Sequence, residues 1–363
     1  MDEWVLCSPH RLDRPWQGRI EHAGAAAEKS YDPNCYLCPG NARAGGHGNP
    51  QYTHVYAFDN DFPALLMPDS GGADLQVGQD SGGAALQASH DAGTAADLAG
   101  LKASTTDALF RAEPARGVCR VLCFSPHHEL TLARMDVKDI AVVVDAWAEE
   151  VEMLTQNREL KYVQIFENKG EMIGASNPHP HCQIWATGHL PVVPARKTAS
   201  QQTYFDAHGR DLLGDYLERE LSSGERIVTS NDDWVVLVPF WAVWPFETMI
   251  VPRRRVSDLP SVERGERNAL AAIMRELMVR YDNLFETSFP YTMGWHGQPL
   301  GDPDPAWRLH ATYMPPLLRS ATVRKFLVGF EQMAEPQRDL TAEQAAQRLR
   351  ETRTTRYLDR GGA

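Results

Sequence analysis

The sequence predicts an α+β fold in which one structural unit occurs twice. The first unit has a strand, a helix and a second strand that begins with histidines, at residues 121–126, 137–154 and 178–181. The same order of elements returns in the second half, at residues 248–252, 268–284 and 309–312. Such a repeat is typical of duplication of a unit in which helices pack on an antiparallel sheet. We therefore expect an N-terminal unit at residues 1–190 and a C-terminal unit at residues 191–363.

Local signals along the first half agree with this pattern. The apolar run Val118–Phe124 predicts a strand, and Asp136 and Asp139 give the next segment the acidic first turn of a helix. Tyr162–Phe166 predicts another strand, and Glu167–Gly170 predicts the turn that follows it.

Two further segments are marked by their composition. Residues from about 67 to 115 are rich in Gly, Ala, Ser and Asp, which predicts a flexible surface insertion with no assigned role. Near the C-terminus, Thr341 and Gln344 form the capping-box pattern that opens a helix.

Composition limits the compartment and the partners. The 363 residues carry a formal net charge of −12 and 43% of them are hydrophobic, which allows one large or two modest domains. The negative charge argues against nucleic acid and anionic membranes as partners. No signal sequence or membrane span is recognisable, so we expect a cytoplasmic protein. The cysteines are few and irregularly spaced, which favours reduced thiols and a metal site over disulfides; they stand at positions 7, 35, 38, 119, 123 and 182.

A row of polar side chains at residues 177–185 is the strongest chemical signal. In a strand, His179, His181 and Gln183 would share one face, while Cys182 and Ile184 would point to the other. The prolines on either side of His179 remove backbone donors, which places the row at the start of a strand or at an exposed edge. The alternative is a pair of edge histidines without a chemical role.

These residue types suit transfer of a nucleotidyl group. A neutral imidazole is a competent nucleophile at phosphorus near pH 7, and a second imidazole two residues away can bind a metal. Gln183 cannot act as an acid, yet it can donate a hydrogen bond to a phosphoryl oxygen. The row therefore favours transfer to another phosphate over activation of water.

Cys35 and Cys38 have the spacing of a metal-binding knuckle. A redox pair and two idle thiols are the alternatives. Because the chain has no second C-x-x-C, a tetrahedral site would have to recruit histidines.

The polar row also resembles a known active-site signature. Ser176-Asn-Pro-His-Pro-His-Cys-Gln-Ile-Trp185 is similar to the signature of galactose-1-phosphate uridylyltransferases, the transferase branch of the histidine-triad superfamily. The resemblance extends over most of the chain, in segments 4–18, 32–41, 315–326 and 337–346. It implies that each half is a histidine-triad-like unit. It also implies the Leloir-pathway exchange of UMP, in which UDP-glucose and galactose 1-phosphate give glucose 1-phosphate and UDP-galactose.

The resemblance implies a role for each residue of the site. His181 would carry UMP covalently in a ping-pong reaction, and Gln183 and Ser176 would donate hydrogen bonds to phosphoryl oxygens. We expect a backbone carbonyl to fix the tautomer of His181. Substrate contacts are implied at Arg11, Arg14, Asn60, Asp61, Phe166, Asn168, Gly174, Ser176, Gln183, Lys325, Phe326, Val328, Glu331 and Gln337. Without the resemblance, the basic residues among them, Arg11, Arg14 and Lys325, would be interpreted as solvated surface charges.

The resemblance also completes the metal site. It adds His128 and His179 to Cys35 and Cys38, with the neighbouring His127 as the alternative to His128. A closed site with two thiolates and two imidazoles would hold one structural Zn²⁺ and would take no part in Lewis-acid chemistry.

The chain departs from its relatives at a second metal site. Relatives often bind iron or zinc there through a Glu, the His of Gly-Trp-His-Gly and a His-x-His pair. This sequence keeps His296 and His310 but has Lys197 and Thr312 at the other two positions, so we predict that the second metal is absent. Thr312 stands where a second nucleophile would be, so only the first unit can carry out covalent chemistry. Cys182 replaces a common Gly, and it adds bulk and possible sensitivity to thiol reagents.

The implied partners are small molecules and a second copy of the chain. The substrates would be UDP-glucose or UDP-galactose with hexose 1-phosphates, and relatives are homodimers with shared active sites. Alternatives are a nucleotide-sugar phosphorylase or adenylyltransferase of the same superfamily, and an inert sugar-nucleotide binder. A histidine-triad hydrolase fits less well, because those enzymes carry a third histidine where Gln183 stands.

Overall fold

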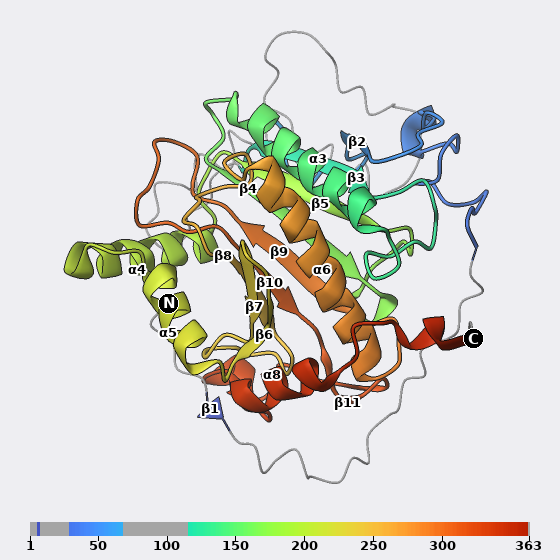
Figure 1. Cartoon of the computed structure of the whole chain (residues 1–363). Coiled ribbons are helices and arrows are strands. Elements are labelled where there is room, and N and C mark those ends of the chain that lie inside the picture. The colour runs from blue at the N-terminus through green and yellow to red at the C-terminus, as the bar shows by residue number, and fades with distance from the viewer. Residues whose placement is uncertain (1–5, 8–28, 68–114, 362–363) are drawn as a thin grey trace.

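The central element of the computed structural model is a nine-stranded antiparallel sheet (Figure 1), within a description that covers residues 6–7, 29–67 and 115–361. The N-terminal half supplies β2 (Tyr56–Asp59), β3 (Gly117–Cys123), β4 (Tyr162–Lys169) and β5 (His181–Thr187). The C-terminal half supplies β6 (Ile227–Ser230), β7 (Trp234–Leu237), β8 (Thr248–Pro252), β9 (Tyr291–His296) and β10 (His310–Met314). The strand order across the sheet is β2-β3-β5-β4-β9-β10-β8-β7-β6.

The two halves join where β4 pairs with β9, from Gln164 opposite His296 to Lys169 opposite Tyr291. Read outward from this junction, the order is β4-β5-β3-β2 on one side and β9-β10-β8-β7 on the other. Equivalent strands therefore occupy equivalent positions, and the predicted α+β fold with antiparallel strands is confirmed. Because the sheet runs through both halves without interruption, the boundary at residue 190 stays a prediction.

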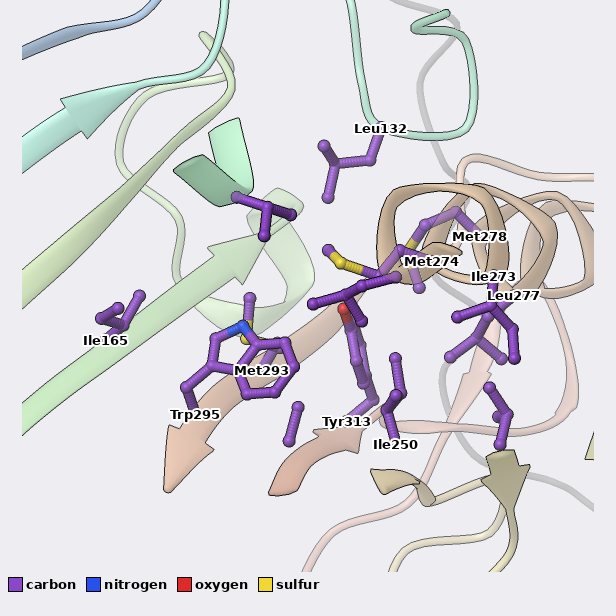
Figure 2. Packing of buried hydrophobic residues seen from close by; sticks show 14 of the residues in the cluster. Leu132, Ile165, Ile250, Ile273, Met274, Leu277, Met278, Met293, Trp295 and Tyr313 are labelled. Carbon is purple, nitrogen blue, oxygen red and sulfur yellow. The ribbon is translucent and has the colours of Figure 1, made fainter. Parts of the chain in front are cut away.

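Long helices cover one face of the sheet and form the main core with it. Helices α3 (Val137–Thr155) and α6 (Arg264–Leu284) lie across this face, and α8 (Ala342–Glu351) lies near its lower end (Figure 1). Figure 2 shows Met293 and Trp295 of β9 and Tyr313 of β10 in the same apolar cluster as Met274 and Met278 of α6. Cys182 and Ile184 belong to this cluster too, so the alternation predicted for β5 is confirmed.

The other face is covered over the C-terminal half by α5 (Leu212–Ser223), which follows α4 (Val192–His208) in the chain. Leu213 and Leu217 of α5 pack against Met249 and Val251 of β8 in a second apolar cluster. A third cluster joins Cys35, Cys38 and Phe58 to β3. His181 and Gln183 therefore lie on this second face of the sheet, between the second cluster and the third.

Two predicted boundaries differ from the structure. Glu167–Lys169 continue β4 instead of forming a turn, because they pair with Tyr291–Met293 of β9, a partner far away in the sequence. Helix α6 begins at Arg264 rather than at residue 268, because Glu263 and Glu266 form a capping box there. The capping box predicted at Thr341 and Gln344 is present at the start of α8.

Shorter elements complete the described chain. They are β1 (Leu6–Cys7), β11 (Leu317–Ser320), β12 (Val323–Arg324), β13 (Gln337–Arg338), α7 (Phe330–Met333), and the 3₁₀ helices η2 (Ala44–Gly46), η3 (Glu171–Ile173) and η4 (Tyr357–Gly361). β1 pairs in parallel with β13, which brings the N-terminal segment beside Gln337.

The predicted insertion lies almost entirely outside the described residues. Leu66 and Arg116, which flank it, form an isolated parallel bridge. The described residues on the two sides of the insertion are therefore neighbours beside β3. In the part of the chain that is described, no helix is long and apolar enough to cross a membrane.

Candidate active site and metal centre

The histidine row lies at the start of β5. β5 is flanked by β3 and β4, with Cys123 opposite His181 and both Val121 and Phe166 opposite Gln183. The strand is therefore central, and the predicted exposed edge is wrong. The other alternative, the start of a strand, is correct, because both prolines precede the first paired residue.

The side chain of His181 is oriented by the backbone of the same turn. Its Nδ1 lies 2.7 Å from the carbonyl oxygen of His179. Since a carbonyl oxygen only accepts, Nδ1 carries the proton and the lone pair is on Nε2. Burial lowers the pKa of His181, against the opposing effect of this hydrogen bond, which favours the neutral ring. The arrangement is suited to a nitrogen nucleophile.

Gln183 and its aromatic neighbours form the next part of the same face. The indole Nε1 of Trp185 donates to Oε1 of Gln183 over 3.0 Å. With the oxygen engaged in this way, the NH₂ group is the side of the carboxamide that can donate to a ligand. The rings of Phe166 and Trp185 meet edge to face, with centroids 5.5 Å apart. The face thus combines a candidate nucleophile, a hydrogen-bond donor and two packed aromatic rings.

The predicted metal ligands come together in three dimensions. One ligand atom from each of Cys35, Cys38, His128 and His179 lies within 4.8 Å of the other three, and all four residues are buried. Cys38 Sγ is 3.5 Å from Nδ1 of His128 and 3.5 Å from Nδ1 of His179. A tetrahedral zinc site requires S···N separations of about 3.6 Å, given usual Zn–S and Zn–N bond lengths. The donor set therefore fits Zn²⁺, and the exposed His127 is not part of it.

Neighbouring groups set the orientation and the protonation state of these ligands. Nε2 of His179 lies 2.8 Å from the carbonyl oxygen of Ser125, so Nδ1 faces the thiols with its lone pair. Burial lowers the pKa of His179 to about 4 and raises that of Cys38 to about 11. A metal cation would supply the charge that stabilises a buried thiolate. His179 also positions His181 through its carbonyl oxygen, which links the metal site to the candidate nucleophile.

Three asparagines hold the turns of the metal site, and the sequence reading assigned them no role. Asn41 donates to the carbonyl oxygen of Cys35 over 2.8 Å, and Asn49 to that of Cys38 over 2.9 Å. Asn177 accepts from the backbone N–H of His179 over 2.9 Å. Short amide side chains that bond to nearby backbone are a general feature of turns, and Asn41 and Asn177 also lie in segments that carry the family resemblance.

Several of the expected substrate contacts lie on or beside the same face. Asn168 follows Phe166 on β4 and accepts from Thr292 over 2.9 Å. Gly174 ends η3 with a φ of 85°, and the exposed Ser176 follows it. Asn60 and Asp61 follow β2, where the backbone N–H of Asn60 donates to Cys119 of β3.

Lys325 is held within its own segment. Its Nζ lies 2.6 Å from Glu331 Oε1, and 3.4 Å from both Gln337 Oε1 and Asp339 Oδ2. The neighbouring Arg324 donates to the carbonyl oxygen of Met172 over 3.0 Å, which ties this segment to η3. Phe326 and Val328 are both exposed. Arg11 and Arg14 lie outside the described residues.

Cys182 faces the core and not the site. Its side chain is 1% exposed, and the indole Nε1 of Trp147 lies 3.2 Å from its Sγ. Burial raises the pKa of the thiol well above its usual value. The suggested sensitivity to thiol reagents is therefore not supported for the folded protein.

Glu167 is a buried carboxyl group between Phe166 and Asn168, on the core face of β4. It accepts from the hydroxyl of Tyr291 over 2.9 Å. Burial raises the pKa of Glu167 from near 4.5 to about 7, although Tyr291 and the charge of Lys169 oppose the shift. Between these pH values the folded state binds a proton that the unfolded state has lost, so stability falls as the pH rises through the interval.

Replacing Glu167 with Gln should remove this pH dependence, because Gln keeps an acceptor for Tyr291 but has no charge to desolvate. Between pH 4.5 and 7, the unfolding free energy of the wild type should fall relative to the Glu167→Gln variant, by at most about 1.4 kcal/mol per pH unit. Urea unfolding at several pH values measures this difference. Glu149→Gln, at an exposed position of α3, is the matched control. Parallel profiles for wild type and Glu167→Gln would contradict the assignment.

Comparison with known proteins identifies the family. Sequence models of the galactose-1-phosphate uridyl transferase N-terminal and C-terminal domains match residues 1–191 and 197–360. The chain belongs to the galactose-1-phosphate uridylyltransferase family. It is 50% identical over 355 residues to the galactose-1-phosphate uridylyltransferase of Rattus norvegicus, covering 96% of this chain and 85% of the rat protein. The Haemophilus influenzae enzyme of that name is 46% identical over 361 residues, covering 99% and 94% of the two chains.

Solved structures agree on the fold of the family. A uridylyltransferase structure superposes with a TM-score of 0.71 at 24% identity, covering 88% of this chain and 92% of that one. An ADP-glucose phosphorylase from Arabidopsis thaliana with bound ADP-glucose superposes with a TM-score of 0.69 at 19% identity, covering 97% and 96%. At these identities the likeness concerns the fold alone.

Proposed function

We propose that the protein transfers UMP from UDP-glucose to galactose 1-phosphate in two steps, with His181 carrying the UMP between them. Membership of the family, and relatives that are galactose-1-phosphate uridylyltransferases, support uridylyl transfer in the Leloir pathway of galactose metabolism. The arrangement of β5 supports the two-step route.

In the first step, the lone pair on Nε2 of His181 attacks the α-phosphorus of UDP-glucose. A P–N bond forms, the P–O bond to glucose 1-phosphate breaks, and glucose 1-phosphate leaves with the electron pair. In the second step, a phosphate oxygen of galactose 1-phosphate attacks the same phosphorus. The P–N electron pair returns to the ring, and UDP-galactose is released.

The observation that carries this proposal is the 2.7 Å contact between Nδ1 of His181 and the carbonyl oxygen of His179. It keeps the proton on Nδ1 in both steps and the lone pair on the reacting nitrogen. Gln183 supports phosphate over water as the acceptor, because a carboxamide can donate to a phosphoryl oxygen but cannot deprotonate water.

The metal-binding group would stabilise the turn that orients His181. Cys35, Cys38, His128 and His179 would hold one Zn²⁺, which supplies structural anchoring because four protein ligands leave no open position. The remaining contribution comes from the chain: the turn that contains His179 presents the carbonyl oxygen that orients His181.

We assign the other contacts from the resemblance to the family, which implies substrate-binding residues at these positions. Ser176 and Gln183 would donate to phosphoryl oxygens, and Arg11, Arg14 and Lys325 would neutralise phosphate charge. Uridine or its phosphates would contact Phe166, Asn168 and Gly174, and Asn60 and Asp61 would also contact substrate. Phe326, Val328, Glu331 and Gln337 would complete the nucleotide-sugar pocket.

We further propose a homodimer in which the segment that follows β12 completes the partner's site. Phe326, Val328, Phe330 and Met333 are exposed together there, with Met333 84% exposed. Apolar side chains gathered on one short segment favour a protein contact over exposure to water. A cytoplasmic location and the absence of nucleic-acid partners remain expectations from composition.

Isotope exchange tests the two-step route. The protein is incubated with UDP-glucose and labelled glucose 1-phosphate without galactose 1-phosphate, and label in UDP-glucose is measured. We expect exchange with wild type and none with His181→Ala. Repeating the measurement with ADP-glucose tests the phosphorylase or adenylyltransferase alternative. Complete turnover with galactose 1-phosphate but no exchange in its absence would indicate direct transfer and contradict the proposal.

A further inference from the structure

The histidine pair of the second half lies at the ends of two neighbouring strands. His296 ends β9 and His310 begins β10, and the two residues are directly opposite each other. Their rings stack with centroids 4.9 Å apart and planes at 25°. Resemblance to the family places a second metal here in relatives, so the donor atoms of this chain decide whether a metal fits.

The donor atoms do not fit a metal. Nδ1 of His310 lies 3.0 Å from the carbonyl oxygen of Arg308, so the lone pair of this ring is on Nε2. Nζ of Lys197 lies 2.9 Å from that Nε2 and donates to it. The lone pair a metal would need is therefore already used. Of the four positions that bind the metal in relatives, only His296, with Nδ1 3.4 Å from the hydroxyl of Tyr162, and Thr312, with its weakly ligating hydroxyl, would remain.

We propose that the amino group of Lys197 takes the place of a second metal ion and links helix α4 to strand β10 through His310. A metal in this position would join side chains of α4, β9 and β10. The contact between Lys197 and His310 joins α4 to β10 without an exogenous ion. The link is then part of the chain, so this region of the fold does not depend on metal supply.

The packing of α4 gives this contact its importance. Of the seventeen residues of α4, only Pro194 and Gln201 are buried. In Figure 1 the helix extends away from the sheet at one side of the molecule. A helix with so little apolar contact depends on the few side chains that reach the sheet. Lys197 is such a side chain, and its partner His310 is 3% exposed.

A buried carboxyl group balances the amino group. Glu247 is held by the backbone N–H groups of Val243 and Trp244, at 2.8 and 3.1 Å. Burial lowers the pKa of Lys197 to about 7, and the charge of Glu247 opposes this shift. Burial also lowers the pKa of both histidines well below the usual value, so neither ring competes as a cation. The amino group of Lys197 thus donates to one neutral imidazole, and the charge of Glu247 favours its protonated form.

Metal content tests the replacement. Wild type and the double variant Lys197→Glu, Thr312→His are purified with zinc and iron supplied, dialysed, and analysed by mass spectrometry of metals. We expect one ion per wild-type chain and two per double-variant chain, because a carboxylate and an imidazole complete the donor set. Adding His310→Ala to the double variant should return the content to one. Two ions per wild-type chain, or one per double-variant chain, would overturn the proposal.

Hydrogen exchange tests the link itself, and none of these readouts depends on uridylyl transfer. Lys197→Met removes the donor, so amide exchange in α4 should accelerate roughly tenfold or more. Lys138→Met, at an exposed position of α3, is the matched control and should leave α4 unchanged. Unchanged exchange in α4 of the Lys197→Met protein would show that the contact does not hold the helix.

Discussion

Replacing His181 with Ala should reduce uridylyl transfer by at least about four orders of magnitude, which corresponds to about 5 kcal/mol in the activation barrier. The side chain of His181 lies on the face of β5 that also carries Gln183. Because its Nδ1 donates to the carbonyl oxygen of His179, the lone pair of the His181 ring is on Nε2 and is available for attack. No other residue of this face supplies a neutral nitrogen nucleophile within the described part of β5. Steady-state rates with UDP-glucose and galactose 1-phosphate measure the effect.

The control for this variant lies on the same segment. His189 is exposed and lies just beyond the end of β5, so His189→Ala should keep wild-type rates. The fold of His181→Ala should also be retained, because the ring is only partly buried and its loss leaves the metal ligands in place. Activity of His181→Ala above a per cent of wild type would rule out His181 as the carrier of UMP.

Replacing His128 with Ala should remove the bound zinc and lower the midpoint of thermal unfolding by roughly 10 °C or more. His128 is one of four buried donors, and three donors close a tetrahedral site poorly. Without the metal, two buried thiols and His179 lose their common partner. Activity should fall with zinc content, because the turn of His179 orients His181.

The neighbouring residue provides a matched control. His127 is exposed and its ring is not part of the metal-binding group, so His127→Ala should keep one zinc per chain and the wild-type midpoint. Metal analysis and a thermal scan of the two variants side by side measure the difference. Full zinc content in His128→Ala would show that His128 is not a zinc ligand.

The chemistry of the site was accessible from the sequence because it depends on local spacing. The two-residue period of a strand placed His181 and Gln183 on one face and Cys182 on the other, and the structure has this arrangement. Cys35 and Cys38 are a short-range pair, and the repeat of elements along the chain indicated a fold built from two similar halves.

What the sequence could not predict depends on contacts between distant segments. Glu167–Lys169 looked like a turn, yet β9 recruits them into β4. That β5 would be central, and that β4 would join β9 in one continuous sheet, follow from the strand order and from no local pattern. The 2.9 Å contact between Lys197 and His310 joins residues 113 positions apart, so only the folded chain brings them together.

Retention of label on the protein tests the central claim most directly. Protein is incubated with UDP-glucose labelled at the α-phosphate, small molecules are removed, and label bound to wild type and to His181→Ala is counted. We predict acid-labile label approaching one UMP per chain on wild type and none on the variant. Absence of label on zinc-loaded wild type, or equal label on His181→Ala, would contradict a uridylyl group carried on His181.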